Sequence, residues 1–355
     1  MSELSLSLPE LGWSHSFQQQ LSIEEWEATV PVRVLSINRK RINVAGEQGH
    51  QQLTVPGNWY LRDAEDLPTI GDWLLLDSAT GQPQRLLERK SLFRRKAAGI
   101  EAKLQLLAAN IDTLFIVTSC NSDFNLSRLE RYLALALDAQ VEPVLVLTKS
   151  DLVDDSLEYQ RQAMSLKPDM AVETVNALDP ESVGPLLAWC GHGQTVAMAG
   201  SSGVGKSTLL NSLCGTSGQA TATIREDDAK GRHTTTARSV HFLPEGGLLI
   251  DSPGIRELQL SDCEAGVSSL FEDIETLAQS CRYKDCSHLS EADCAVKAAV
   301  DGGDLSSRRL TNYNKLMAEQ ERNSETIAEK RRRERDFGKL CRSVMAVKRK
   351  ERKDC

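Results

Sequence analysis

The chain lacks the features that would place it outside the cell or in a membrane. It contains no apolar run of about 20 residues, the length that a membrane-spanning helix needs. The N-terminus has no basic stretch followed by an apolar one, which argues against a secretory signal peptide. Its nine cysteines are odd in number and three stand close to a histidine, which suits a reducing compartment and a metal better than disulfides. We therefore expect a cytoplasmic protein that does not associate with membranes.

Excess positive charge is absent except at the C-terminal end. The 355 residues carry a formal net charge of −8 and are enough for two or three domains. Within residues 331–355, eleven Lys and Arg face four Asp and Glu, a net charge of +7 that leaves −15 for the rest of the chain. This segregation predicts a tail that binds a polyanion. The alternative is a solvated helix over 305–330 with a disordered tail, and either could bind RNA on ordering.

A phosphate-binding loop is present as G-S-S-G-V-G-K-S over residues 200–207, which matches G-x-x-x-x-G-K-[ST]. An apolar run with strand character precedes it at 195–199, and residues 208–213 begin as a helix, which is the context that the motif needs. Lys206 is expected to reach the β- and γ-phosphates and to act in catalysis, and Ser207 to bind Mg²⁺. Backbone N–H groups and the helix N-terminus should surround the phosphates. The GTP-binding residues predicted here are Gly200, Ser201, Ser202, Gly203, Val204, Gly205, Lys206, Ser207 and Thr208.

A base-reading motif, T-K-S-D, ends the apolar run at 143–148. The run fits a buried parallel strand whose carboxyl end delivers a loop, the place where open α/β sheets bind ligands. Asp151 is expected to accept hydrogen bonds from the N1 and N2 groups of guanine, a donor pair that adenine lacks. Lys149 should lie along the face of the base. The guanine-binding residues predicted here are Thr148, Lys149, Ser150 and Asp151.

Two further segments are expected to hold Mg²⁺ and the γ-phosphate. In D-S-P-G at 251–254, Asp251 should hold Mg²⁺ through a water molecule, and Gly254 should donate its N–H to the γ-phosphate. Between this motif and the phosphate-binding loop lies G-R-H-T-T-T at 231–236. One of its three threonines should complete the Mg²⁺ shell as the switch I residue, and Thr235 is favoured over its two neighbours.

The residue that follows the D-x-x-G glycine is Ile255. A Ras-like GTPase has a glutamine at this place, which orients the attacking water. An aliphatic side chain cannot position water, so intrinsic hydrolysis should be slow. His233 could take over this role, because histidine is the commonest acid–base side chain. Otherwise His233 is a switch-loop residue that contacts RNA or solvent.

The order of these motifs along the chain is unusual. The base reader at 148–151 precedes the phosphate-binding loop at 200–207, which in turn precedes D-S-P-G at 251–254. An ordinary GTPase has the phosphate-binding loop first. The observed order predicts a circularly permuted GTPase domain. Its second switch, which contains D-S-P-G at 251–254, then stands at the C-terminal end of the domain and leads directly into the next part of the chain.

Short strands with no helical period fill residues 31–96, and the turns between them are marked by Gly, Asn and Pro. Five such strands suit an OB-type barrel, a common nucleic-acid platform, although another small β domain would give the same pattern. A basic run at 85–96 suggests a nucleic-acid edge or a solvated linker. The predicted strands lie at 32–37, 41–44, 52–55, 72–77 and 84–88.

A metal-binding pattern, C-x4-C-x-H-x5-C, is formed by Cys281, Cys286, His288 and Cys294. Three thiolates and one imidazole in so short a span suit a tetrahedral structural Zn²⁺ site. Four protein ligands leave no open position for catalysis. The alternative is a cluster of buried cysteines without a metal.

Taken together, the motifs resemble those of the ribosome small subunit-dependent GTPase A family, which are bacterial circularly permuted GTPases of small-subunit biogenesis. The resemblance covers about residues 30–345, and it includes the permuted motif order, the Cys/His set and A-A-N-I-D at 108–112. It implies a multidomain protein with a β-barrel, an α/β domain and a helical domain. The parts are a polar N-terminal extension (1–30), an OB-fold domain (31–96), a circularly permuted P-loop GTPase domain (97–261), a mostly helical zinc-binding domain (262–330) and a basic C-terminal tail (331–355).

The resemblance implies a GTPase that binds the 30S ribosomal subunit and its 16S rRNA and assists late maturation of that subunit. It implies that the subunit stimulates hydrolysis of GTP to GDP and phosphate, after which the factor is released. The switch I histidine, His233 here, is then the candidate catalytic residue. One structural Zn²⁺ and Mg²⁺ with GTP are the expected cofactors, and we expect a monomer. Two departures stand out: the chain has no basic N-terminal tail, and Asn176-Ala177 stands where Ser-Ala is common in the last base loop.

Two other functions fit parts of the pattern. A P-loop kinase would need a substrate pocket and acid–base groups that the sequence does not reveal, and Asp151 argues against adenine. A non-catalytic RNA-binding protein in which GTP only stabilises the fold would be compatible with Ile255. Against that alternative, Lys206, Ser207 and Asp251 are all present.

Overall fold

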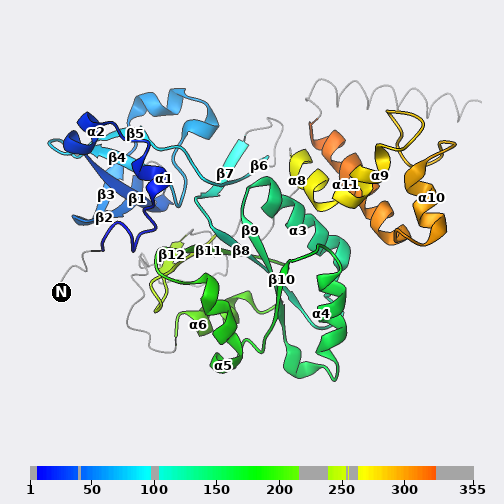
Figure 1. The fold of residues 1–355 in the computed structure, drawn as a ribbon. Helices are drawn as coiled ribbons and strands as arrows, with labels where there is room; N and C mark the ends of the chain where they lie inside the picture. The colour runs from blue at the N-terminus through cyan, green and yellow to red at the C-terminus, as the bar shows by residue number, and fades with distance from the viewer. Residues whose placement is uncertain are drawn as a thin grey trace, which may run out of the picture.

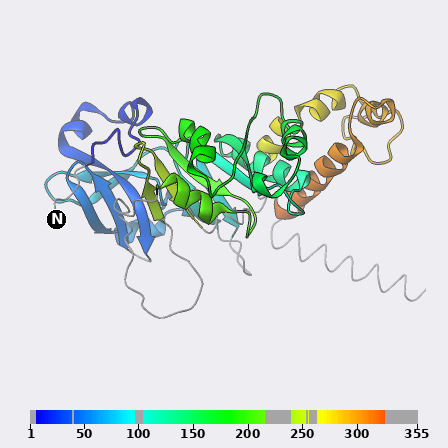
Figure 2. The ribbon, with the colours of Figure 1, turned by 90° about the horizontal axis from the view of Figure 1, so that it is seen from below.

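The structure, a computed structural model, describes residues 6–38, 41–96, 104–215, 239–252, 255 and 263–324. Three parts follow one another along the chain: an antiparallel β domain, a mostly parallel α/β domain and a group of helices. Seen from below, the β domain and the helices lie at opposite ends, with the α/β domain between them (Figure 2). The predicted division into a β, an α/β and a helical region is confirmed.

The N-terminal sheet consists of five strands, as predicted. Their order across the sheet is β3-β2-β1-β4-β5, and all neighbours are antiparallel. Alternate apolar residues of these strands, among them Val34, Val44 and Leu74, are buried in a core of their own. The elements are β1 (Thr29–Asn38), β2 (Arg41–Gly46), β3 (Gly49–Thr54), the 3-10 helices η1 (Gly57–Leu61) and η2 (Ala64–Asp66), β4 (Trp73–Asp77) and β5 (Pro83–Leu86).

The N-terminal stretch, expected from the sequence to be a polar extension, packs against this sheet. It forms two short helices, α1 (His15–Gln18) and α2 (Ile23–Ala28). Phe17 of α1 is buried, and Trp13 meets the ring of Trp73 edge-on, with 4.8 Å between the ring centroids. The segment therefore packs into the main hydrophobic core, which Phe17 and Trp73 share with residues of the α/β domain such as Leu114.

A buried arginine joins the N-terminal stretch, the β domain and the α/β domain. Arg33 of β1 is 2% exposed and donates to the carbonyl oxygens of Leu11 (2.5 Å), Asn110 (3.1 Å) and Gly71 (3.3 Å). Burial lowers the pKa of Arg33 to about 10. The side chain of Asn110 donates in turn to the Gly71 oxygen over 3.0 Å. These bonds fix the β domain beside the strands that carry the nucleotide motifs.

A two-stranded ribbon links the first two domains. It pairs β6 (Leu92–Lys96) with β7 (Leu104–Ala109) and so spans the expected domain boundary at residues 96 and 97. The basic run at 85–96, which leads into this ribbon, makes ion pairs within the chain. Arg89 forms a two-pronged ion pair with Asp72, whose side chain is fully buried, and Arg85 pairs with Glu25. These bonds account for two of the arginines without any nucleic acid.

The central sheet has the strand order β10-β9-β8-β11-β13-β12, with only the edge strand β12 antiparallel. The strands of the base reader, β8 to β10, precede β11 of the phosphate-binding loop in the chain, so the permuted order is built into the sheet. Helices cover both faces (Figure 1). The elements are β8 (Thr113–Ser119), α3 (Leu126–Asp138), β9 (Glu142–Thr148), η3 (Ser150–Leu152), α4 (Ser156–Met164), β10 (Ala171–Thr174), α5 (Pro180–Val183), η4 (Gly184–Trp189), β11 (Thr195–Ala199), α6 (Lys206–Leu213), β12 (Ser239–Phe242) and β13 (Leu248–Asp251).

Between residues 263 and 324 the structure shows four helices, and the first of them lies against α3. At Gly266, a Cβ atom would stand 2.0 Å from the Ala134 oxygen, so only glycine allows this close approach of α8 to α3. The helices are α8 (Glu264–Leu270), α9 (Glu272–Ala278), α10 (Ala295–Gly302) and α11 (Ser307–Ser324). Among the described residues, no helix is both long and apolar enough to span a membrane.

Candidate nucleotide and metal sites

The phosphate-binding loop joins β11 to α6, as the sequence predicted. Gly200 has φ +144°, and a Cβ atom there would stand 2.2 Å from the Val117 oxygen, so the loop needs glycine at this point. Lys206 is 8% exposed and its Nζ donates to the carbonyl oxygens of Gly200 (2.8 Å) and Ser201. The ammonium group is thus held over the loop whose N–H groups would surround a phosphate chain.

Thr148 connects the base reader to the phosphate-binding loop. Its side chain is fully buried, and its hydroxyl lies 2.5 Å from the Val204 oxygen and 3.1 Å from the Thr118 oxygen. The hydroxyl therefore orders the backbone of the phosphate-binding loop instead of facing the base. The sequence motif included Thr148 among the guanine-binding residues without revealing this bond.

The rest of the base reader stands at the carboxyl end of β9, as expected for a ligand-binding loop. Lys149 adopts a left-handed backbone conformation, with φ +58°, and its Nζ donates to the Gly203 oxygen over 2.8 Å. Its aliphatic stem is thereby laid across the phosphate-binding loop. Asp151 follows in η3 with an exposed side chain. The two motifs, some 50 residues apart in sequence, form one site.

The loop at 176–178 lies beside the base reader because β10 pairs with β9. The Asn176 side chain accepts from Leu178 N (3.0 Å), and the Ser212 hydroxyl of α6 donates to the Ala177 oxygen (2.6 Å). The loop is therefore tied to the helix that starts at the phosphate-binding loop. The loop is therefore placed where a third base-contacting segment would lie. In the sequence, this segment was indicated only by the dipeptide Asn176-Ala177.

Asp251 ends β13, which runs parallel to β11, so its carboxylate is delivered at the same sheet edge as the phosphate-binding loop. Across the edge pair, Ser239 of β12 stands opposite Asp251, and the Ser239 hydroxyl lies 3.1 Å from Nε2 of His241. Burial lowers the pKa of His241, against the opposing effect of Asp251. Gly254, His233, Thr235 and residues 331–355 lie outside the described part of the chain.

Ile255 is fully buried in the main hydrophobic core. Its backbone N–H donates to the Ser252 oxygen over 3.0 Å. A buried aliphatic side chain offers no polar atom with which to position water. That Ile255 takes no part in positioning water stays a prediction.

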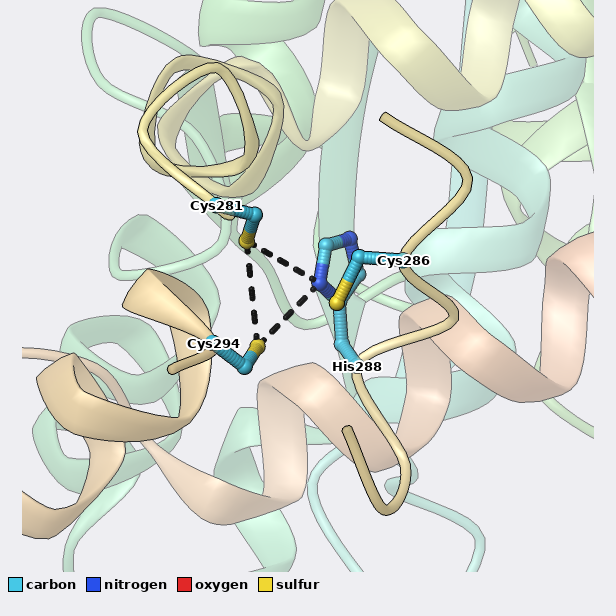
Figure 3. Close-up of side chains that lie close together, drawn as sticks. All are labelled: Cys281, Cys286, His288 and Cys294. Carbon is cyan, nitrogen blue, oxygen red and sulfur yellow. Dashed lines mark hydrogen bonds between the residues drawn. The ribbon is translucent and has the colours of Figure 1, made fainter. Parts of the chain in front are cut away.

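The four predicted metal ligands come together between α9, α10 and the loop that joins them (Figure 3). The Sγ atoms of Cys281 and Cys294 are 3.8 Å apart, and Nδ1 of His288 lies 3.7 Å and 3.4 Å from them. All ligand atoms, including Sγ of Cys286, lie within 4.8 Å of one another. Tetrahedral zinc with its usual bond lengths separates two sulfurs by roughly 3.8 Å and sulfur from nitrogen by roughly 3.5 Å. The donor set and its spacing fit Zn²⁺.

A carboxylate shapes the loop that carries His288. Glu291 accepts from the Ser287 hydroxyl (2.5 Å) and from the N–H groups of Ser287 (3.1 Å), Leu289 (3.0 Å) and Ser290 (3.0 Å). The bonds from Ser287 and its neighbours lower the pKa of Glu291 to about 2. They enclose His288, whose backbone is left-handed with φ +58°. Glu291 thus holds the histidine in the conformation that points its ring at the sulfurs.

Comparison with known proteins decides the family. A family model described as RsgA GTPase matches residues 86–261, and one described as 50S ribosome-binding GTPase matches residues 195–328. A Vibrio parahaemolyticus protein named small ribosomal subunit biogenesis GTPase RsgA 2 is 54% identical over 345 residues, covering 97% of this chain and 94% of its own. A Mesorhizobium japonicum protein, named small ribosomal subunit biogenesis GTPase RsgA, is 46% identical over 323 residues, covering 90% and 92%. The chain belongs to the RsgA family of GTPases.

Solved structures agree with this RsgA fold. The crystal structure of YjeQ from Thermotoga maritima superposes with a TM-score of 0.60 at 24% identity, covering 82% of this chain and 98% of its own. The structure of YloQ, described as a circularly permuted GTPase, gives 0.58 at 23% identity and covers 84% and 97%. At this level of identity the likeness concerns the fold, and it confirms the permuted arrangement predicted from the motif order.

One group of residues at the junction of the RsgA GTPase domain and its C-terminal helices escaped sequence analysis. Glu130 of α3 is fully buried, and Arg308, Arg309 and Asn312 of α11 all donate to its carboxylate. Single charged residues on helices are ordinarily solvated, and no local spacing links positions 130 and 308. The sequence therefore contains no signal that would have found this contact.

Proposed function

We propose that this protein binds the 30S ribosomal subunit through its 16S rRNA and assists late maturation of the subunit. It hydrolyses GTP to GDP and phosphate when the subunit stimulates it, and is then released. The observation that carries the proposal is the meeting of Lys206, Lys149 and Asp251 at one sheet edge of a permuted GTPase fold. The names of the RsgA relatives supply the link to the small subunit.

In this proposal GTP lies along the carboxyl edge of the central sheet. Asp151 accepts from guanine and Lys149 covers the base, while the loop from Gly200 to Gly205 wraps the phosphates with its N–H groups. Lys206 turns from the loop carbonyls toward the β- and γ-phosphates, where its charge offsets the negative charge of the transition state. Ser207 and Thr208, at the start of α6, add the N-terminal end of a helix to the phosphate site.

The residues that would hold Mg²⁺ are Ser207, Thr235 and, through water, Asp251. When bound, the ion would neutralise charge on the β- and γ-phosphates. Gly254 would donate its N–H to the γ-phosphate, and His233 would orient the attacking water in place of Ile255. Support comes from the burial of Ile255 and from Asp251, which stands at the same sheet edge as the phosphate-binding loop.

The Cys281, Cys286, His288 and Cys294 set would hold one structural Zn²⁺, which stabilises the fold of the C-terminal helices without a catalytic role. We propose five parts for the chain, with boundaries at 1–30, 31–96, 97–261, 262–330 and 331–355. The segment after Asp251 enters this zinc-binding part directly, so ordering of the switches by GTP can bias how the zinc-binding and β domains sit on rRNA. The protein would act as a cytoplasmic monomer.

GTP hydrolysis by the purified, zinc-loaded protein tests the proposal, with and without purified 30S subunits. Hydrolysis should be slow alone and should rise strongly only with GTP and 30S together. ATP in place of GTP, and 50S subunits in place of 30S, serve as controls. Equal turnover with and without 30S subunits would remove the ribosome from the mechanism and leave a GTPase with another partner.

A further inference from the structure

A large cleft lies between the GTPase domain and the C-terminal helices. It is at the end of the central sheet where β9 and β10 begin, opposite the end that carries the nucleotide motifs. Its volume is about 1090 Å³. One wall comes from the start of β9 and the segment between α4 and β10, and the other from α8, α9 and the turn before α11. Because β9 and β10 begin at this cleft, and the nucleotide motifs follow their carboxyl ends, an occupant would not compete with GTP for space.

The cleft has an apolar interior and an acidic rim. Leu166, Leu270 and Leu305 line it with buried side chains, and Met170 and Leu277 with half-buried ones. Exposed carboxylates stand around it on Glu142, Asp169, Glu272 and Asp304. Its two basic side chains are Lys167 and Arg309, and the latter already forms a two-pronged pair with Asp273. Such a lining repels phosphate groups and favours a cationic, partly apolar polypeptide.

The chain itself contains a segment of this kind. Residues 331–355 carry eleven Lys and Arg against four Asp and Glu. Apolar side chains recur within it at 337, 340, 341, 344 and 345, the spacing that gathers them on one face of a helix. An amphipathic helix lying in an apolar groove is a recurrent mode of polypeptide recognition. The charge of the segment complements the rim, and its apolar positions complement the interior.

The segment can reach the cleft. Ser306 and Arg309, at the start of α11, line the cleft, and the 18 residues of this helix carry the chain about 27 Å away from it. The thirteen residues from 325 to 337 can span up to about 43 Å when extended. Phe337 and the residues after it can therefore return to the cleft without disturbing α11.

We propose that residues 337–345 of the basic tail dock as an amphipathic helix in the cleft lined by Leu166, Leu270 and Leu305. The docked tail touches the GTPase domain on one wall and the zinc-binding helices on the other, so it joins the two domains. The same basic side chains cannot lie on the acidic rim and on rRNA at once. The small subunit must then compete for the tail, a consequence that rests on the proposed function, whereas the docking itself does not.

Chymotrypsin cleavage after Phe337 and Leu340 in the full-length, zinc-loaded protein tests the docking, because docked side chains are shielded from the protease. We expect slow cleavage at low salt and rapid cleavage at 1 M salt, where the screening length falls to about 3 Å. Reversal of one charge on each wall, Glu142→Lys with Asp304→Lys, should raise the low-salt rate about tenfold. The matched control, Glu27→Lys with Asp63→Lys, makes the same charge change on the β domain and should leave the rate unchanged.

A second variant guards against damage to the folded domains. Val344→Asp alters only the tail and should also accelerate cleavage after Phe337 if that apolar face is buried. Cleavage of the wild-type tail at the same rate as in both variants, at low and high salt alike, would overturn the proposal. So would a tail that becomes protected only when 30S subunits are added, because the polyanion would then be its ligand. None of these outcomes depends on GTP hydrolysis.

Discussion

Glu130 and Arg308 face each other across the boundary between the GTPase domain and the C-terminal helices, with two bonds of 2.8 Å and 3.0 Å between carboxylate and guanidinium. The Glu130 side chain is fully buried and also accepts from Asn312 over 2.5 Å. Arg309 adds a bond to Glu130 and pairs on its other side with Asp273 of α9. This buried cluster fastens α11 and α9 to α3, so the C-terminal helices move with α3 as long as the cluster stays intact.

Replacing Glu130 should therefore destabilise the junction strongly. Glu130→Gln leaves two guanidinium groups facing a neutral side chain, and losing one partner of a buried ion pair costs about 3 kcal/mol or more. Urea unfolding of the zinc-loaded protein, followed by a probe in the C-terminal helices, should show this loss. Glu319→Gln is the matched control, because Glu319 forms the neighbouring α11–α3 pair with Arg131 in a partly exposed setting, worth about 1 kcal/mol or less. Equal effects of the two substitutions would contradict the role assigned to Glu130.

Two glycines of the phosphate-binding loop should respond differently to replacement by alanine. Gly200→Ala places a Cβ atom 2.2 Å from the Val117 oxygen, whereas the same change at Gly203 meets nothing within 4 Å, although both residues have positive φ. The extra clash should weaken GTP binding by about 10- to 100-fold at Gly200, corresponding to 1–3 kcal/mol of strain, and clearly less at Gly203. Fluorescent-nucleotide titration measures both. A larger loss for Gly203→Ala would mean that the loop geometry described above is wrong.

Local motifs explain how much could be predicted. The phosphate-binding loop, the base reader and the Cys/His cluster each depend on residue types at short spacings, so the sequence alone predicted them, and the structure brings the four Cys/His side chains together. The permuted sheet followed from their order. Contacts that join distant segments were not predictable: Arg33 on Leu11 and Asn110, Trp13 on Trp73, and Glu130 on Arg308. In the sequence, an isolated charged residue is ordinarily read as solvated and an isolated aromatic residue as one more apolar side chain. Only the packed fold brings these distant partners together.

The metal site should depend on Glu291 as well as on its four ligands. Glu291→Gln removes the carboxylate that accepts from Ser287, Leu289 and Ser290, so His288 loses the support of its left-handed conformation. Partners of this kind typically change metal affinity by about 10- to 100-fold. Competition with a coloured zinc chelator should show this loss, while Asp285→Asn, in the same loop, should retain zinc like the wild type. Cys294→Ser should lose the metal altogether. If this variant still bound one equivalent of zinc, Cys294 would not be a metal ligand.

Acid should destabilise the edge of the central sheet through His241. Burial lowers the pKa of His241 below the ordinary value of 6.5. At pH values between the lowered pKa of the folded state and 6.5, the unfolded chain therefore binds more protons than the folded one. Stability contributed by the neutral ring is present above pH 6.5 and is lost as the pH falls below it. His241→Gln should therefore show a flatter decline of melting temperature between about pH 7 and pH 5 than the wild type. His50→Gln, exposed on β3, should leave the profile unchanged, and identical profiles for His241→Gln and the wild type would remove His241 as the cause.

Stimulated hydrolysis should depend on His233, because the buried side chain of Ile255 cannot orient water and the sequence offers a histidine in the switch I segment. His233→Ala should bind GTP and 30S subunits as the wild type does, while 30S-stimulated turnover falls by about 100-fold or more, the usual contribution of a positioned acid–base group. Ile255→Ala is the informative companion: it opens a cavity in the core and should lower the melting temperature while leaving a larger share of the stimulated rate. If His233→Ala retained full stimulated turnover and Ile255→Ala abolished it, the water would have to be positioned by the segment that Ile255 anchors, and His233 would be a contact residue only.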